Sequence, residues 1–352
     1  MAGPGLTALQ FRLSPQLVQI LQHLRLSLLI STYQAGRVLL LGTHAGQLTI
    51  SSLACQRPMG IAAGSHSLAI GTGSEIRFLA AQPGVVPGLQ PPGHFDRCFV
   101  PQTSKYTGNI LGHDLAWGSA GLWVVNTLFS CLCTLDDRHS FVPQWTPPFI
   151  TQIADEDRCH LNGLAMENGK PAYVTALAQT DTPAGWRADK IRTGCLIRVS
   201  DSSVIATDLC MPHSPRMHAE QLYVLNSGHG ALCRVDLQSG VLEQVATVPG
   251  YTRGLALHDR FAFVGLSRIR ESNVFGGLPI ARQSLHCGLA VIDLISQQTV
   301  AHLEFLNTID EIFAVECLPD CLNAAVGGAE LQGDTREIWI VPQAASGLPQ
   351  RL

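Results

Sequence analysis

The sequence predicts an all-β protein, a β-propeller in which six blades are favoured, and three observations lead to that prediction. Of its 352 residues, 46% are apolar and only 14% are charged, with 33 Gly and 20 Pro, a composition that suits many short strands joined by turns. A short motif recurs about every fifty residues along the chain. Helical periodicity is almost absent, and its clearest instance is residues 15–24, where Leu17, Ile20, Leu21 and Leu24 share one face.

The recurring motif places one or two polar residues before a small apolar triplet. Its equivalent positions are Gly60, Asp114, Gly163, Pro215, Gly254 and Phe313. Each motif is followed by a β-prone run, at 67–71, 122–126, 172–176, 222–226, 261–265 and 323–327. A further run follows at 76–80, 131–135, 195–199, 231–236, 288–294 and 337–341, and some repeats add a fourth, such as 241–248. Several short strands in each repeat are typical of a propeller blade. Six motifs favour six blades. The additional strands at the N-terminus leave seven blades as an alternative.

The two chain ends complement each other. Residues 26–32, 37–41 and 47–53 read as second, third and fourth strands without a first, whereas the last repeat shows no clear fourth strand. We therefore expect strands from both termini to close the ring and remove its open sheet edges. The predicted organisation is an N-terminal extension with a short helix (1–25), a single propeller domain (26–345) and a C-terminal tail (346–352).

Net charge and the lack of targeting signals restrict the kinds of partner and the compartment that we expect. The net charge is −4, so the sequence shows no electrostatic footprint for nucleic acid or an anionic membrane. Residues 1–10 lack the pattern of a secretory signal, and no apolar run is long enough to span a bilayer. Eleven cysteines at scattered spacings fit reduced thiols. We expect a cytoplasmic protein with a small-molecule or peptide ligand, and a protein partner stays open.

The polar residues of the motifs are the candidate site. Because the first strand of each blade lines the central channel, these residues should ring one channel mouth. They are His113, Asp114, His160, Asn162, His213, Arg216, Arg253 and Glu311. The structural alternative for any single histidine is a core residue hydrogen-bonded to the backbone. For the set, burying so many polar groups without a use is costly.

The residues at this channel mouth suit three functions: metal binding, general-base catalysis and anion binding. His113, His160 and His213 are candidate ligands of a divalent metal ion. A His–Asp pair orients a general base, which makes His113, Asp114, His160 and His213 the candidate catalytic residues. Arginines clamp an anion, and the candidate ligand-binding residues are Asn162, Arg216, Arg253, Arg268, Glu271 and Glu311.

Two loops border the expected site. Arg268 and Glu271 lead into a long insertion, residues 272–285, that we interpret as a lid. A surface Arg–Glu pair is the structural alternative. Residues 185–187 present Trp186 as an exposed wall of the pocket, whereas residues 155–158 read as a solvated acidic turn.

The function expected from these residues is binding of a small polar or anionic molecule, with hydrolase- or isomerase-type chemistry and a divalent metal ion as extensions. The sequence has no G-x-S-x-G elbow, GxGxxG motif or P-loop. The alternative is a non-catalytic propeller that presents its loops to a protein or peptide. An exposed apolar patch favours the alternative, and a deep polar pocket with perturbed titrating groups favours the enzyme.

Short segments spread over nearly the whole chain are similar to those of a known protein family. They stand at 31–37 (STYQAGR), 113–118, 122–135 (opening LWVVNT), 141–150, 156–164, 211–216, 267–279 and 310–315. Together they resemble a bacterial family of conserved hypothetical β-propeller-like proteins, which implies the fold and no activity.

A more remote resemblance is local. Residues 161–165 (LNGLA) look like the N-G-L-A turn of gluconolactonase- and strictosidine-synthase-like six-bladed propellers. In the gluconolactonase branch an Asn of this turn helps to bind a divalent cation. The resemblance therefore implies Asn162 as a candidate ligand, whereas the Glu and Asp ligands have no clear counterpart here, so it supports fold more than chemistry.

Overall fold

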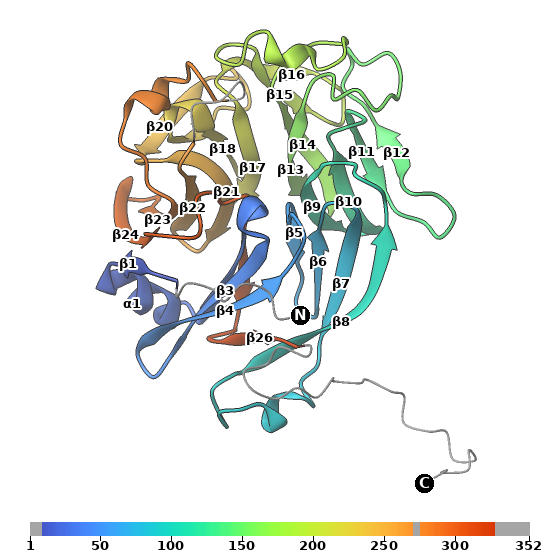
Figure 1. Cartoon of the computed structure of the whole chain (residues 1–352). Coiled ribbons are helices and arrows are strands. Elements are labelled where there is room, and N and C mark those ends of the chain that lie inside the picture. The colour runs from blue at the N-terminus through green and yellow to red at the C-terminus, as the bar shows by residue number, and fades with distance from the viewer. Residues whose placement is uncertain (1–8, 270–274, 328–352) are drawn as a thin grey trace, which may run out of the picture.

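Six sheets stand around one axis, which confirms the all-β, six-bladed propeller (Figure 1). The computed structural model describes residues 9–269 and 275–327. In this part of the chain the innermost strands β5, β9, β13, β17, β21 and β25 contact one another in that order, and β25 also contacts β5. The ring therefore closes after six blades rather than seven.

Each blade carries its strands in order from the channel outwards. Blade 1 consists of β25 (Ala314–Pro319), β2 (Leu26–Ser31), β3 (Arg37–His44) and β4 (Gln47–Ala54). Blade 2 consists of β5 (Ile61–Ala63), β6 (Ser67–Gly71), β7 (Glu75–Ala81), β8 (Arg97–Tyr106) and β26 (Ala324–Val326). Blade 3 consists of β9 (Gly112–Gly118), β10 (Gly121–Asn126), β11 (Cys131–Thr134) and β12 (Val142–Trp145).

The other three blades follow the same plan. Blade 4 consists of β13 (Leu161–Glu167), β14 (Lys170–Ala176), β15 (Gly194–Arg198) and β16 (Val204–Leu209). Blade 5 consists of β17 (Pro212–His218), β18 (Gln221–Asn226), β19 (Ala231–Val235) and β20 (Leu242–Thr247). Blade 6 consists of β21 (Tyr251–His258), β22 (Phe261–Ser267), β23 (Gly288–Asp293), β24 (Gln298–Phe305) and β1 (Phe11–Leu13). The helices are α1 (Pro15–His23) and the short 3₁₀ turns η1 (Tyr33–Ala35), η2 (Val86–Gly88), η3 (Gly185–Arg187), η4 (Ser227–His229) and η5 (Pro279–Arg282).

All six motif positions lie where the repeat predicts. Four fall inside innermost strands, and Gly60 and Phe313 immediately precede β5 and β25. Gly163 marks how closely these strands approach: a Cβ at this position would stand 2.4 Å from Cδ of Pro215 on β17. The centre of the ring is therefore packed by small residues and backbone, and only a few polar side chains fit there.

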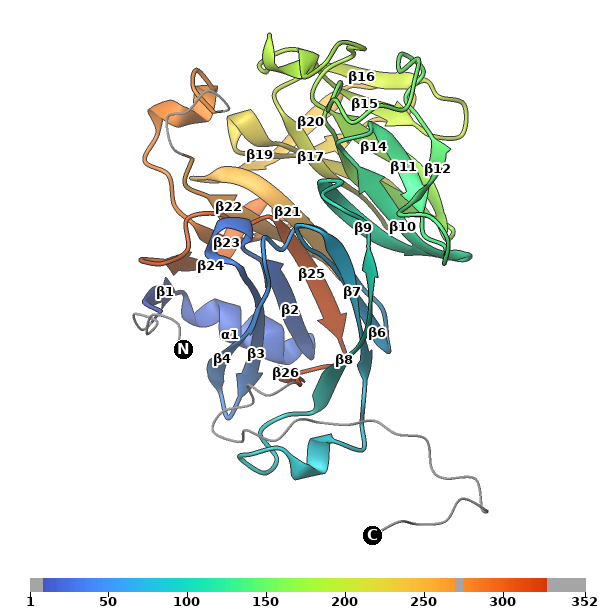
Figure 2. The same cartoon turned by 45° about the vertical axis from the view of Figure 1, so that its right-hand side comes forward.

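Strands from both termini close the ring, as predicted. In blade 1, β25 pairs antiparallel with β2, with Ala314 opposite Ser31, and Figure 2 shows β25, in red, alongside the blue strand β2. The hydroxyl of Ser31 accepts a hydrogen bond from the Ala314 amide at 3.0 Å. It donates to the Met59 carbonyl at 2.6 Å. One side chain thus joins the closing strand to the segment that enters blade 2.

The prediction that residues 323–327 form a second strand is wrong. That place in blade 1 is occupied by β2, so the C-terminal segment instead covers the outer edge of blade 2. Here β26 pairs parallel with β8. The carboxylate of Asp96 accepts hydrogen bonds from the amides of Leu322 and Asn323 and holds this crossing. The predicted strand at 337–341 and the tail at 346–352 lie outside the described residues.

The segment before blade 1 packs on the ring. The predicted helix is present as α1, and Leu17 and Leu21 are fully buried in the core that α1 shares with blades 1 and 6. Strand β1 pairs with β24, with Phe11 opposite Phe305. All eleven cysteines have free thiols. Among the described helices, none has the length and apolar character needed to cross a membrane.

Candidate functional site

One channel mouth brings together the predicted histidines and Arg253. The rings of His113 and His160 lie 4.8 Å apart, nearly perpendicular, and the ring of His213 lies 5.8 Å from that of Tyr251. The charge of Arg253 acts on both His113 and His213. We call this group the histidine mouth; its members are His113, His160, His213, Tyr251, Arg253, Glu311 and Phe313.

The rings of His113 and His213 are held in the same way. Nδ1 of His113 lies 2.9 Å from the Leu111 carbonyl oxygen, and Nδ1 of His213 lies 2.8 Å from that of Met211. A carbonyl can only accept, so Nδ1 carries the proton in both rings. Nε2 of each neutral ring therefore keeps its lone pair for a ligand or a proton.

In blades 3 and 5 a side-chain hydroxyl also lies close to Nδ1 of the histidine. Thr127 Oγ1 lies 2.9 Å from Nδ1 of His113, and Ser227 Oγ lies 3.1 Å from Nδ1 of His213. Both hydroxyl residues directly follow the second strand of their blade. The two histidines thus occupy equivalent positions in blades 3 and 5.

His160 reaches the mouth from a different position. Strand pairing sets Gly112, Leu161 and Pro212 at equivalent places, opposite the last residues of β10, β14 and β18. Asn162 therefore matches His113 and His213, whereas His160 matches Leu111 and Met211. His160, Leu111 and Met211 share a left-handed backbone, with φ of 51°, 53° and 50°.

His160 is oriented by Asp157, for which the sequence predicted no role in the site, and by Trp186, which was expected as an exposed wall of the pocket. Its Nδ1 lies 2.9 Å from Asp157 Oδ1, and Trp186 Nε1 donates to Asp157 Oδ2 at 2.9 Å. The Trp186 ring lies 4.3 Å from the His160 ring. The prediction of an exposed Trp186 is wrong, since only 2% of this residue is exposed. Residues 155–158 are likewise not a solvated turn, because Asp157 and Arg158 are buried and Arg158 pairs with Glu156 and Asp181.

Burial sets the protonation of the mouth. It holds the pKa of His113 and of His213 well below the usual value, and the nearby charge of Arg253 acts in the same direction. Burial also lowers the pKa of Arg253 and raises the pKa of Glu311. Both histidines are therefore neutral at physiological pH.

Arg253 is fixed on two sides. Its Nη1 lies 3.3 Å from Glu311 Oε1, and its Cζ lies 3.4 Å from the centre of the Phe313 ring. Tyr33 stacks against Phe313 at 5.5 Å. The guanidinium thus has a defined position against an aromatic face.

A pocket of about 230 Å³ opens beside Arg253. It is lined by Gln34, Tyr251, Arg253, Ser267, Arg268, Ile269, Phe275 and Glu311. Arg268 is held by Asp310 at 3.2 Å and donates to the Phe305 carbonyl. The predicted lid is partly described: Phe275 lies 5.2 Å from the Tyr251 ring, and Leu278 and Ile280 are buried beside it. Glu271 lies outside the described residues.

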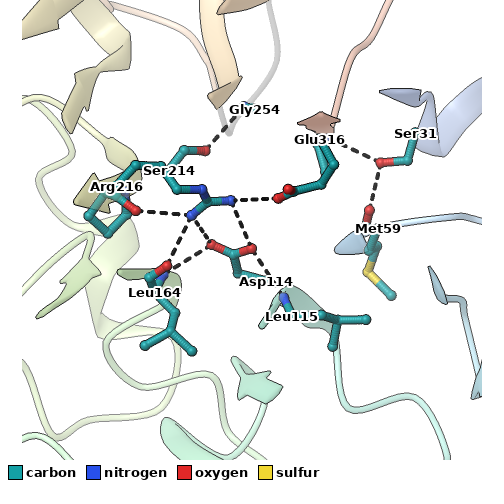
Figure 3. A network of polar contacts seen from close by, with 11 residues as sticks. Ser31, Met59, Asp114, Leu115, Leu164, Ser214, Arg216, Gly254 and Glu316 are labelled. Atoms are coloured by element: carbon teal, nitrogen blue, oxygen red, sulfur yellow. Dashed lines mark hydrogen bonds and ion pairs between the residues drawn. The ribbon is translucent and has the colours of Figure 1, made fainter. Parts of the chain in front are cut away.

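Asp114 and Arg216 pair with each other in a polar network that also includes Glu316 (Figure 3). Arg216 makes two contacts with the Asp114 carboxylate, at 2.8 and 3.2 Å, and one with Glu316 at 3.4 Å. Asp114 also accepts hydrogen bonds from the amides of Leu115 and Leu164. We call Asp114, Arg216 and Glu316 the channel plug. The predicted roles of Asp114 in catalysis and Arg216 in ligand binding stay predictions.

The cation-ligand role that the remote resemblance implies for Asn162 stays a prediction, and this side chain is buried. Its Oδ1 accepts a hydrogen bond from Thr175 Oγ1 at 2.6 Å, and its Nδ2 is buried without a partner among the described residues. In residues 9–269 and 275–327, no three His, Cys, Asp or Glu side chains are grouped to hold a metal ion. The three-histidine metal site stays a prediction, and the proposals below do not use it.

Three solved structures are similar to this chain at low sequence identity, and the first of them shares its fold. A chain of a nidogen–laminin complex is 10% identical, with 84% of this chain and 99% of that chain covered and a TM-score of 0.53. A streptogramin B lyase is 13% identical (69% and 67% covered, TM-score 0.40). A protein of unknown function from Bacteroides caccae is 10% identical (83% and 98% covered, TM-score 0.40).

A comparison with curated proteins gave no match. One family model, in contrast, covers nearly all of the propeller, from α1 to the last described strand, which confirms the resemblance to an uncharacterised family. The chain belongs to the family described as a domain of unknown function, DUF4915, whose model matches residues 15–326.

Proposed function

We propose that the histidine mouth binds a small molecule carrying a carboxylate or phosphate group. The observation that carries this proposal is the position of Arg253. This residue is only 9% exposed, yet it lines the pocket of about 230 Å³. A guanidinium has five N–H donors, and the contact with Glu311 uses one of them. An oxyanion is the partner that such a fixed, buried cation binds best.

The rest of the pocket suits the same class of ligand. Arg268 adds a second cation, and the hydroxyl-bearing Tyr251 and Ser267 also line the pocket. Burial raises the pKa of Glu311, and its single contact with Arg253 leaves other N–H donors of the guanidinium for a ligand. The volume lies below that of a typical drug-sized site, so we propose a ligand of a few heavy atoms.

The neutral imidazoles add chemistry to binding. Nε2 of His113 and of His213 keeps its lone pair, because Nδ1 of each ring is held by a carbonyl. Both rings feel the charge of Arg253, which lines the pocket. This arrangement supports proton transfer of the hydrolase or isomerase type, with the His160–Asp157 pair beside it. We also place the protein in the cytoplasm, which the eleven free thiols support.

Nothing specific favours the alternative of a protein- or peptide-binding propeller. The exposed large apolar side chains among the described residues stand in separate segments: Tyr106, Ile153, Ile191, Val241, Ile295 and Leu306. Single exposed apolar residues are ordinary on a soluble surface.

Calorimetric titration with malonate and with inorganic phosphate tests the proposal. We expect at least one of these anions to bind with a dissociation constant below about 1 mM. A bound anion favours protonated histidine, so it raises the histidine pKa and binding takes up a proton. Affinity is therefore expected to rise as the pH falls below the usual histidine pKa near 6.5. If neither anion binds, or if affinity does not depend on pH in this range, the proposal is wrong.

A further inference from the structure

The opposite end of the channel holds a second pocket, of about 240 Å³. Its lining residues include Ala63, Trp117, Met166, Arg216, Met217 and Glu316. On β9, β17 and β25, the lining residues Trp117, Met217 and Glu316 lie three or four positions after His113, His213 and Phe313. Because a strand rises about 3.3 Å per residue, this pocket lies beyond the channel plug from the histidine mouth.

The plug leaves one negative charge facing this pocket. Arg216 makes two contacts with Asp114 but only one, at 3.4 Å, with Glu316. Two carboxylates thus share one guanidinium. The Glu316 side chain is 22% exposed, whereas that of Asp114 is only 6% exposed. The surplus charge is therefore the one that a ligand in the pocket would meet.

Few other charged groups act on Glu316. Arg216 comes from β17, Asp114 from β9, and Cys317 follows Glu316 on β25. From β5 and β13 the lining consists of apolar side chains, among them Ala63 and Met166. The pocket therefore offers the Glu316 carboxylate, with Arg216 as its partner, beside apolar side chains.

The wall itself is aromatic and rich in sulfur. Trp117 Nε1 donates to the Ala62 carbonyl at 3.2 Å, which fixes the indole ring where it lines the pocket. Met166 and Met217 are partly exposed beside it. Aromatic faces attract cations, and thioethers adapt to irregular apolar groups.

We propose that this second pocket binds a small organic cation, with its ammonium group against Glu316 and its alkyl groups on Trp117, Met166 and Met217. A divalent metal ion needs several oxygen or nitrogen ligands, and this pocket presents one exposed carboxylate. An ammonium group with methyl substituents matches both the charge and the apolar wall. This inference is independent of the anion site.

The two sites differ in their response to pH. Burial raises the pKa of Glu316 to about 7, so a bound cation favours the ionised carboxylate and releases a proton. Affinity for a permanent cation is therefore expected to rise as the pH increases from about 6 to about 8. The anion site is expected to show the opposite trend, which separates the two proposals in one set of titrations.

Choline and its neutral isostere 3,3-dimethylbutan-1-ol provide the test, by calorimetric titration of the full chain. We expect choline to bind at least about tenfold more tightly than the alcohol, since only choline carries the charge. Glu316→Gln is expected to remove this preference and the pH dependence. Glu243→Gln, at an exposed position on β20, is the matched control and is expected to change neither.

Folding is checked separately, because Glu316 is part of the plug. Glu316→Gln keeps the size of the side chain and removes a buried surplus charge, so at pH 8 its unfolding midpoint should not fall. Trp117→Leu, which leaves the plug intact, should also weaken choline binding. Absence of choline binding, equal binding of choline and the alcohol, or an unchanged affinity in Glu316→Gln would overturn the proposal.

Discussion

Replacing Arg216 with alanine is expected to lower the free energy of unfolding by about 3–5 kcal/mol. Arg216 is the only cation in the channel plug, and it contacts carboxylates from blades 3 and 1 while also donating to the Leu164 carbonyl of blade 4. Its removal leaves Asp114, which is 4% exposed, with two backbone hydrogen bonds but without a counter-charge. Chemical denaturation at pH 8, above the pKa of about 7 of Glu316, gives the largest loss.

Two further variants show whether the loss comes from the unpaired charge. Asp114→Asn combined with Arg216→Ala should recover part of the stability, because the buried carboxylate is then neutral. Arg234→Ala breaks an exposed ion pair with Glu243 on the outer strands and should cost little. If Arg216→Ala costs no more than Arg234→Ala, the plug does not hold the blades together.

Replacing Arg253 with glutamine is expected to weaken binding of malonate or phosphate by about 10–150-fold. This range corresponds to the loss of hydrogen bonds to a charged group, each worth about 1.5–3 kcal/mol. The substitution keeps a polar side chain over Phe313 and removes only the charge and part of the donor set. Calorimetric titration of the variant beside the wild-type protein measures the change directly.

Glu311 complicates that substitution, because it loses its counter-charge in the variant. Arg253→Gln combined with Glu311→Gln removes both charges and keeps the site neutral, and it should bind the anion as weakly as the single variant. Arg12→Gln, at a surface pair with Glu304, should bind like the wild-type protein. Retention of wild-type affinity in Arg253→Gln would exclude this residue as the anion ligand.

The fold followed from the sequence because the repeated triplet is a local signal. Burial of each triplet places the motif in an innermost strand, so Asp114 and Gly163 lie where the repeat predicts. The prediction that residues 323–327 form the second strand of the last blade was wrong. Two segments of similar strand propensity compete for that position, and β2 occupies it. That competition is a tertiary effect, which strand propensity does not report.

The site was predicted in part. The register of His160 depends on a left-handed residue just before β9, β13 and β17, and no glycine marks this conformation in the sequence. The Asp157–Trp186 contact spans 29 residues and the Arg216–Glu316 contact spans 100. The first pair joins two loops that flank strands of blade 4, and the second joins blades 5 and 1. Both form only in the folded ring, so the partners cannot be read from spacing. For Glu316 the sequence contained one indication of a place in the channel, since this residue directly follows the last motif.

NMR titration of ¹⁵N-labelled histidines, with and without phosphate, tests the central claim most directly, namely that neutral, Nδ1-protonated imidazoles stand beside an anion site. Without phosphate, His113 and His213 should show the Nδ1–H tautomer and stay neutral well below the usual histidine pKa near 6.5. Phosphate should raise the pKa of both, and the Arg253→Gln variant should abolish that rise. Charged rings or Nε2–H tautomers in the free protein, or a histidine pKa unchanged by phosphate, would contradict the account.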